Sequence, residues 1–262
     1  MPHPPSASPG TAVRERVAQK RPDTIAGMFD EISPRYDVLN HVLSGGTDFY
    51  WRWRTARALG LTGREVVLDL CTGTSDLAIE LLRRGRARRV VGLDFAGEML
   101  RIGQRKLAHL ELAARAPLMR GDAMFLPLAD ATVDAVTIAF GIRNVQRPDV
   151  ALREIARVLK PGGRVAVVEF SLPRLPGVRQ VYSFYFRHIL PRVGALLSNH
   201  ADAYTYLPES VGEFHPPERF VALLGEEGFV SVRATSLTFG VAQLYLGVKD
   251  GTRPAETSST AS

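Results

Sequence analysis

The feature that constrains the fold most is the alternation of short apolar stretches with amphipathic ones through the middle of the chain. The apolar stretches predict strands at residues 65–70, 89–94, 116–122, 133–140 and 164–170. The amphipathic stretches predict helices at 76–85, 96–110 and 147–160. Because each strand is nearly all apolar, the sheet needs cover on both faces, which is typical of parallel strands joined by helices. Right-handed crossovers then predict an α/β, doubly wound sheet.

The C-terminal part has a different pattern. Residues 229–237 and 242–249 are strand-like and are separated by only a few residues, including Gly240. So short a connection joins antiparallel strands. The pattern therefore predicts a mostly parallel sheet that is closed by a C-terminal antiparallel hairpin.

We expect one domain over residues 21–249, with disordered tails at 1–20 and 250–262, where Pro, Ser and Thr are frequent. Within the domain, a helical cap is expected at about residues 22–60. An aromatic insertion is expected at about residues 171–215, where the sequence contains VYSFYF and YTY.

Bulk composition excludes several classes of protein. The N-terminus lacks the pattern of a secretory signal, and no apolar run reaches the ~18 residues of a membrane span. The single cysteine, Cys71, excludes an internal disulfide and a Cys-based zinc cluster, and the six histidines show no metal spacing. A cytoplasmic protein without a metal site is expected. The net charge of +6 suits nucleic acid, an anionic membrane or an anionic ligand, and it selects none of them.

Ligands of doubly wound sheets bind outside the carboxyl ends of the strands, so the residues there are candidates for a site. The first strand leads into the loop of VVLDLCTGTSD (66–76), which has one glycine where dinucleotide-binding loops have two or three. The next helix begins with Asp76, whose carboxylate repels a phosphate and suits a cationic ligand. An ordinary helix cap explains Asp76 equally well. The pattern favours S-adenosylmethionine, which has a sulfonium, an ammonium and no phosphate, over NAD.

Two further strand ends carry polar residues that suit an adenosine. Asp94 ends the second strand, where a carboxylate can accept hydrogen bonds from both ribose hydroxyls. Asp122 follows the third strand and could accept from the adenine amine, while the small Ala123 leaves room for the ring.

Several motifs resemble known families. VVLDLCTGTSD, VVGLD, GDA and LKPGGR resemble the class I S-adenosylmethionine-dependent methyltransferases, which have a Rossmann-like sheet. FGIRNV (140–145), AYTYLPESV (203–211) and residues 28–54, MFDEISPRYDVLNHVLSGGTDFYWRWR, resemble the C-methyltransferases of menaquinone and ubiquinone biosynthesis. The similarity spans about residues 21–249.

The resemblance implies that S-adenosylmethionine is the cofactor. It implies cofactor contacts at Thr74, Asp94, Asp122 and Ala123, and we count Asp69, at the end of the first strand, with them. This sequence departs from many relatives at Ser75, where they have glycine. A positive φ at Ser75 would cost about 1 kcal/mol.

The reaction that the resemblance implies moves a methyl group to a ring carbon of a prenylated quinol. We expect demethylmenaquinol to be converted to menaquinol, because CTGTSD and TFGVAQLYLG look closer to that branch. The alternative acceptor is 2-methoxy-6-polyprenyl-1,4-benzoquinol of ubiquinone biosynthesis.

Arg143 and Asn144 are the candidates for stabilising the quinol oxygen, because they follow the fourth strand at the expected site. An arginine stays protonated, so Arg143 cannot readily act as a base. A structural ion pair with a neighbouring acidic residue is the alternative for Arg143. Tyr204 and Tyr36 are candidates for contacting the quinol, and Asp48 is a candidate for accepting the proton.

Other functions and partners stay open. An RNA methyltransferase is disfavoured because GIRN stands where such enzymes often carry N/D-P-P-Y/F, so no nucleic-acid partner is expected. A non-catalytic cofactor-binding protein is a further alternative. The basic, aromatic segment 178–197 either packs on the sheet edge or meets the isoprenoid tail and anionic lipid headgroups at the inner face of a membrane. A homodimer is also left open.

Overall fold

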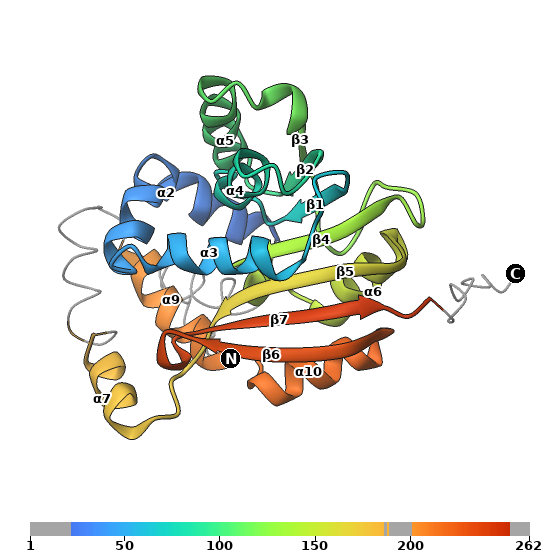
Figure 1. The fold of residues 1–262 in the computed structure, drawn as a ribbon. Helices are drawn as coiled ribbons and strands as arrows, with labels where there is room; N and C mark the ends of the chain where they lie inside the picture. Colours follow the sequence, from blue (N-terminus) through green and yellow to red (C-terminus); the bar gives the residue numbers. More distant parts are fainter. Residues whose placement is uncertain (1–21, 186–187, 189–200, 252–262) are drawn as a thin grey trace, which may run out of the picture.

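The computed structural model describes residues 22–185, 188 and 201–251, which contain one seven-stranded sheet with helices on both faces (Figure 1). The predicted tail at 1–20 and the part of the predicted C-terminal tail beyond Gly251 lie outside the described residues. The strands are β1 (Val66–Leu70), β2 (Arg89–Asp94), β3 (Leu118–Arg120), β4 (Val133–Ala139), β5 (Leu159–Phe170), β6 (Phe229–Leu237) and β7 (Ala242–Lys249). The α-helices are α2 (Pro22–Leu43), α3 (Thr47–Ala58), α4 (Asp76–Arg83), α5 (Gly97–His109), α6 (Pro148–Val158), α7 (Pro176–Phe184), α9 (Ala201–Glu213) and α10 (Pro217–Glu226). Short 3₁₀ helices are η1 (Ala113–Arg115), η2 (Ile142–Asn144) and η4 (Thr238–Gly240).

The strand order is β3-β2-β1-β4-β5-β7-β6. Strands β1 to β5 run parallel to one another, whereas β7 lies antiparallel between β5 and β6. The predicted doubly wound, mostly parallel sheet with antiparallel C-terminal strands is confirmed. The order of the strands reverses between β1 and β4, and ligands of such sheets bind at the reversal, outside the carboxyl ends.

Both faces of the sheet are buried, as the apolar strands predict. Buried residues of β1, β4, β5 and β7 pack against α3, α4 and α5 on one face. Alternate residues of the same strands pack against α6 and α10 on the other face. In β5, for example, Val165 and Val167 belong to the second layer, whereas Ala166 and Val168 belong to the first. This alternation follows from the two-residue period of a strand.

Of the two helices that precede β1, α2 lies toward the carboxyl ends of the parallel strands, and α3 runs along one face of the sheet (Figure 1). Gly45 and Gly46 connect α2 to α3 with φ angles of 57° and 75°, which glycine adopts without steric cost. Trp51 of α3 then packs against both Phe140 and Phe170, with ring centroids 5.7 and 5.8 Å away. Helix α3 therefore covers the ends of β4 and β5.

Two elements differ from the sequence-based predictions. β5 begins at Leu159, five residues before the predicted strand, and includes the Pro-Gly-Gly sequence at residues 161–163. The pairing with β4 jumps from Val133–Leu159 to Ala135–Arg164, so the extra residues form an irregularity within the strand. Helix α10 was not predicted from the sequence, although it packs Phe220 and Leu224 into the core.

Candidate active site

The loop between β1 and α4, residues 71–75, has a tightly constrained backbone. Cys71, Gly73 and Ser75 have φ angles of 51°, 52° and 69°. Ser75 thus occupies the left-handed conformation in which a non-glycine residue is strained. Gly103 of α5 makes room for it, because a Cβ on Gly103 would lie 2.4 Å from the Ser75 hydroxyl. The loop therefore depends on close approach of α5.

Asp94 joins the end of β2 to this loop. Its carboxylate accepts hydrogen bonds from the backbone N–H of Gly73 at 2.8 Å and of Ala96 at 2.9 Å. Burial raises the pKa of Asp94 to about 6. Each carboxylate oxygen has two acceptor positions, so Asp94 can also accept from the hydroxyls of a ligand at the loop.

Asp122 and Ala123 lie one strand further out. β3 pairs with β2 so that Arg120 is opposite Asp94, and Asp122 follows two residues later. The Asp122 carboxylate accepts from the backbone N–H of Met124 at 2.8 Å, which fixes its direction. Ala123 is buried beside it. The structure thus brings Asp94, Asp122 and Ala123 to one edge of the sheet.

Asp69 and Thr74 are already bonded within the protein. The buried Asp69 carboxylate accepts from the Thr72 hydroxyl at 2.6 Å and from the Thr137 hydroxyl at 2.5 Å, and burial raises its pKa to about 6. These bonds hold the loop against β4, which makes Asp69 a support of the loop. The Thr74 hydroxyl donates to Asp37 of α2 at 2.5 Å. Thr74 therefore links the loop to the cap helix.

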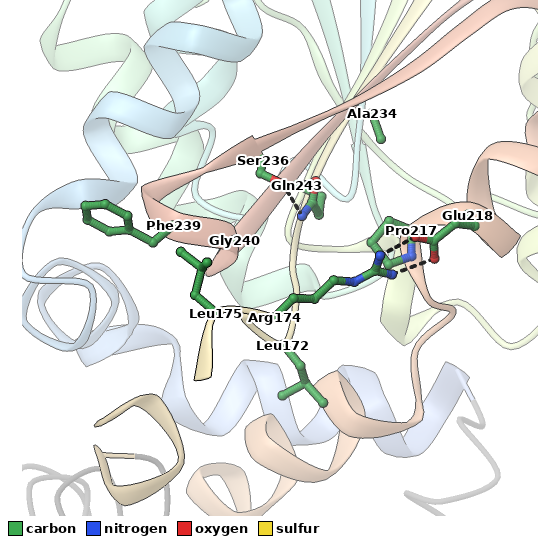
Figure 2. Close-up of a pocket in the computed structure, with 10 residues that line it drawn as sticks. All are labelled: Leu172, Arg174, Leu175, Pro217, Glu218, Ala234, Ser236, Phe239, Gly240 and Gln243. Carbon is green, nitrogen blue, oxygen red and sulfur yellow. Dashed lines mark hydrogen bonds and ion pairs between the residues drawn. The ribbon is translucent and has the colours of Figure 1, made fainter. Parts of the chain in front are cut away.

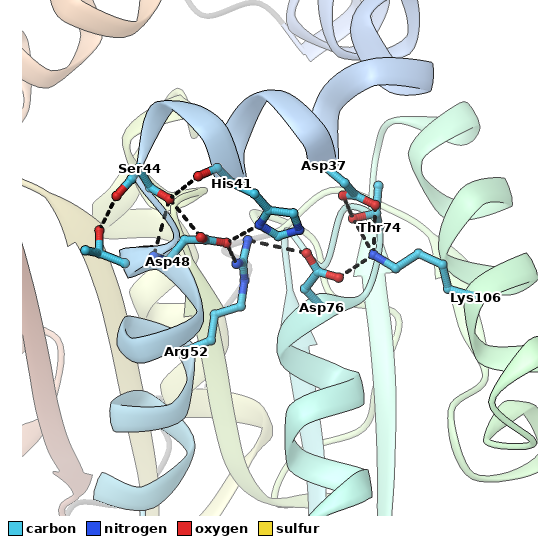
Figure 3. A network of polar contacts seen from close by, with 9 residues as sticks. Asp37, His41, Ser44, Asp48, Arg52, Thr74, Asp76 and Lys106 are labelled. Carbon is cyan, nitrogen blue, oxygen red and sulfur yellow. Dashed lines mark hydrogen bonds and ion pairs between the residues drawn. The ribbon is translucent and has the colours of Figure 1, made fainter.

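A chain of charged side chains extends from this link across α2, α3, α4 and α5 (Figure 3). Lys106 of α5 contacts Asp37 at 2.9 Å and also pairs with Asp76. Arg52 of α3 lies 3.5 Å from Asp76 and pairs with Asp48. The cap helices are thereby fixed to both sides of the loop.

The charges of this network correct two sequence-based arguments. Asp76 was taken to suit a cationic ligand, but that argument is wrong because Lys106 and Arg52 already neutralise its carboxylate. Asp48, the candidate proton acceptor, accepts from His41 and from Ser44, each at 2.7 Å. Burial would raise the pKa of Asp48, but Arg52, Ser44 and His41 together lower it below its usual value. A carboxylate with a lowered pKa is a weak base.

Arg143 lies in η2, directly after β4, and forms a buried ion pair. Its Nη1 donates to Oε1 of Glu169 at 2.7 Å and to the carbonyl of Phe140. The guanidinium carbon lies 5.4 Å from the centroid of the Phe170 ring. Burial alone would lower the pKa of Arg143, but Glu169 raises it, so the guanidinium stays charged. The Nε–H group is buried without a hydrogen-bond partner and remains available to an acceptor.

Asn144 contacts a tyrosine that the sequence did not single out. The hydroxyl of Tyr206, on α9, donates to Oδ1 of Asn144 at 2.9 Å. Burial raises the pKa of Tyr206 to about 12, so the phenol stays protonated. The side chain of Tyr204, which was predicted instead, lies outside the described part of α9. The YTY sequence contains both residues, so it could have indicated Tyr206 as well.

Tyr36 of α2 is close enough to charged groups of both parts of the candidate site to be affected by them. Burial raises the pKa of its phenol, and the charges of Arg143, Arg52 and Asp94 all act on it. Its ring packs edge to face on Phe29 with centroids 5.9 Å apart. Tyr36 is thus within reach of both halves of the candidate site.

Cys71 lies at the start of the loop and packs closely on η2. A Cβ on Gly141 would lie 2.2 Å from the Cβ of Cys71, so only glycine is tolerated there. Burial and the nearby carboxylates raise the pKa of the Cys71 thiol, which keeps it protonated. A protonated thiol is a poor nucleophile. Among the residues that the structure describes, no cluster of three His, Cys, Asp or Glu side chains is arranged to hold a metal.

The sheet order, the loop after β1 and the acidic residue at the end of β2 define the class I methyltransferase fold that the motifs resemble. A solved S-adenosylmethionine-dependent methyltransferase from Thermotoga maritima superimposes with a TM-score of 0.59. The match covers 86% of this chain and 99% of that protein, at 17% sequence identity. At this identity the likeness concerns the fold alone.

The chain belongs to the ubiE/COQ5 methyltransferase family, whose profile matches residues 15–249. It is 47% identical over 220 residues to a demethylmenaquinone methyltransferase of Thermus thermophilus, covering 84% of this chain and 99% of the relative. It is 46% identical over 222 residues to a ubiquinone/menaquinone biosynthesis C-methyltransferase of Syntrophotalea carbinolica, covering 85% and 92%. The family resemblance noted from the motifs is confirmed.

Proposed function

We propose that the protein transfers the methyl group of S-adenosylmethionine to a ring carbon of a prenylated quinol, with demethylmenaquinol as the acceptor. The observation that carries the proposal is the buried guanidinium of Arg143. It stands beside Asn144 at the end of β4, and its Nε–H has no hydrogen-bond partner among the residues that the structure describes. A charged donor held in a buried site stabilises an oxyanion more strongly than the same donor in water.

The residues around the β1 loop are suited to S-adenosylmethionine. Asp94 offers a buried carboxylate for the ribose, and Asp122 with Ala123 offers an acceptor and space for the adenine. The bound cofactor supplies an activated methyl group, so the chain needs no covalent nucleophile. The contribution of the protein is then to align the acceptor carbon with that methyl group.

Besides this alignment, the reaction needs an activated acceptor, and Arg143 provides for that. A quinol ring carbon becomes nucleophilic as a ring hydroxyl loses its proton, and the guanidinium stabilises the oxygen that is left with negative charge. Glu169 keeps Arg143 charged and fixed, because one carboxylate oxygen binds Nη1 and the other accepts from the backbone N–H of Arg143 at 3.3 Å. Tyr206 orients Asn144 beside it.

Turnover of two acceptors tests the proposal. Purified protein would be incubated with S-adenosylmethionine and either a short-chain demethylmenaquinol or the 2-methoxy-6-prenyl-1,4-benzoquinol analogue, both kept reduced. We expect the naphthoquinol to gain one methyl group by mass. Methylation of the benzoquinol alone would transfer the assignment to the ubiquinone branch. Saturable cofactor binding without turnover of either quinol would support the non-catalytic alternative.

We further propose contact with a membrane surface through α7. None of the helices in the described residues is long and apolar enough to cross a bilayer. Val181 and Phe184 lie three residues apart on α7 and are both exposed, as is Arg179. Residues at this spacing share one face of a helix. An exposed apolar face with a nearby arginine suits an anionic bilayer surface.

Co-sedimentation with vesicles tests the membrane contact. We expect the protein to sediment with anionic vesicles and the double variant Val181→Ser, Phe184→Ser to remain in solution. Val230→Ser is the matched control, because Val230 is exposed on β6, away from α7. Equal sedimentation of all three proteins would contradict the proposal.

A further inference from the structure

A groove of about 400 Å³ lies where the chain leaves β5, beside the hairpin of β6 and β7 (Figure 2). Its mouth is apolar: the side chains of Leu172, Leu175 and Phe239 are exposed, and Phe239 is 73% exposed. Single exposed apolar residues are common, but three at the mouth of one groove indicate an apolar occupant.

The backbone holds the largest of these side chains outward. Thr238, Phe239 and Gly240 have consecutive φ angles of 46°, 57° and 91°, and the first two are strained because they are not glycine. The Thr238 hydroxyl accepts from the indole N–H of Trp51 at 2.8 Å, which fixes the turn to α3. Strain of this kind persists where surrounding structure enforces it and is frequent at ligand sites.

The sheet register connects the groove to the candidate active site. Glu169 of β5 lies opposite Gln243 of β7, and Gln243 lies opposite Ser236 of β6. Directly opposite residues of antiparallel strands project from the same face. Gln243 and Ser236 line the groove, and Glu169 holds Arg143. The groove is therefore on the same sheet face as Glu169. Gln243 is one interstrand spacing, about 5 Å, from Glu169, and Ser236 is two spacings, about 10 Å, away.

The polar groups of the groove are paired with one another. Arg174 and Glu218 form an ion pair at 2.5 Å across the rim, as Figure 2 shows. The side-chain amide of Gln243 donates to the Ser236 hydroxyl at 2.9 Å. A charged ligand would have to break these pairs, whereas a hydrocarbon chain can lie across them without breaking them.

We propose that this groove holds the first isoprene units of the acceptor's side chain. The inference rests on the proposed function, because it assumes that the quinol ring lies beside Arg143 and Asn144. A prenylated ring there must extend a neutral, branched hydrocarbon chain away from the site. The groove offers that chain polar groups that are already paired, and the exposed apolar side chains of Leu172, Leu175 and Phe239. It thereby makes the protein selective for prenylated acceptors.

The test compares kcat/KM for 1,4-naphthoquinol without a side chain with kcat/KM for the same ring carrying one or two isoprene units. In the wild-type protein, we expect the prenylated acceptors to be preferred by about tenfold or more, as a few buried apolar carbons allow. Ala234→Phe fills the groove from an exposed position on β6. We expect this variant to lose the preference while it methylates the unprenylated ring at the wild-type rate.

Two further variants keep the test decisive. Val230→Phe adds a ring at an exposed position of β6 that does not line the groove, and it is expected to keep the wild-type preference. Leu175→Ser removes an apolar wall without adding bulk, and it is expected to lower kcat/KM for the prenylated acceptors alone. Cofactor affinity by calorimetry should be the same in all the proteins, which shows that the variants are folded.

The outcomes separate the groove from the proposed function. A preference that persists in Ala234→Phe and Leu175→Ser would overturn the groove assignment and leave the function standing, as would a wild-type protein without any preference. An equal loss on both kinds of acceptor in both variants would show that the groove supports the fold rather than the side chain. Failure of the wild-type protein to methylate any quinol would overturn the function itself, and the inference with it.

Discussion

Arg143 and Glu169 form an ion pair in which the Glu169 carboxylate is completely buried, and they stand at the ends of the neighbouring strands β4 and β5. One carboxylate oxygen binds the guanidinium and the other accepts from the Arg143 backbone. The alternative that Arg143 has only a structural ion pair is therefore partly right: the pair exists. The unpartnered Nε–H is the feature that a purely structural pair does not require.

Arg143→Lys tests whether Arg143 acts on the acceptor as well as forming the ion pair with Glu169. Lysine retains a positive charge but cannot bind Glu169 and a second acceptor in one plane. We expect kcat to fall by about a hundredfold or more, as is typical when an oxyanion donor is lost. Cofactor affinity should be unchanged, because Arg143 is not among the residues around the β1 loop. A wild-type kcat would contradict the role of Arg143.

Glu169→Ala leaves the guanidinium buried without its counterion. Removing one partner of a buried pair costs about 3–5 kcal/mol of the free energy of unfolding. Urea denaturation measures this loss. Glu226→Ala is the control, since it breaks the exposed pair with Arg219 and should have little effect. Equal stability of the two variants would show that the Glu169 pair is unimportant for the fold.

Tyr206→Phe removes the hydroxyl that binds Asn144. Loss of one such hydrogen bond is expected to lower kcat by about fivefold, equivalent to about 1 kcal/mol. Tyr204→Phe, measured beside it, tests the residue that the sequence pattern favoured. A larger effect in Tyr204→Phe would return the role to Tyr204.

The strands were largely predictable from the sequence, whereas the side-chain contacts between residues far apart in the sequence were not. The strands at 89–94, 229–237 and 242–249 have the predicted bounds because apolar alternation and local turns determine them. The Arg143–Glu169 contact joins residues of two strands, and the Asp76–Lys106 contact joins two helices. No local pattern encodes such pairs. The charge of Asp76 was therefore misread, although its position beside the loop was right.

Cofactor binding should depend on pH through Asp94. Because burial raises its pKa to about 6, Asp94 is ionised at pH 7 and protonated at pH 5. We expect the dissociation constant for S-adenosylmethionine to rise by about tenfold at pH 5 if only the carboxylate binds the ribose. Asp94→Asn should bind weakly at both pH values. The control is Asp69→Asn, because the pKa of Asp69 is also raised to about 6. This variant should keep the pH dependence of cofactor binding. Loss of the dependence in Asp69→Asn would assign it to Asp69 instead of Asp94.

The same pKa shifts stabilise the folded protein as the pH falls, although they weaken cofactor binding there. A folded-state pKa above the usual 3.8 means that the folded protein binds protons that the unfolded chain has already lost. The contribution of Asp69 and Asp94 to the free energy of unfolding therefore becomes more favourable as the pH falls from 7 through about 6. Asp69→Asn should reduce this dependence in urea titrations at several pH values. An unchanged dependence would assign it to other groups.

The most direct test of the central claim is the position of the transferred methyl group. The wild-type protein would be supplied with isotopically labelled S-adenosylmethionine and a reduced, prenylated naphthoquinol, and the product analysed by carbon NMR. We expect the label on the ring carbon next to the quinol oxygen, with kcat reduced in Arg143→Lys. A label on oxygen, or no labelled quinol despite cofactor binding, would contradict C-methylation at Arg143.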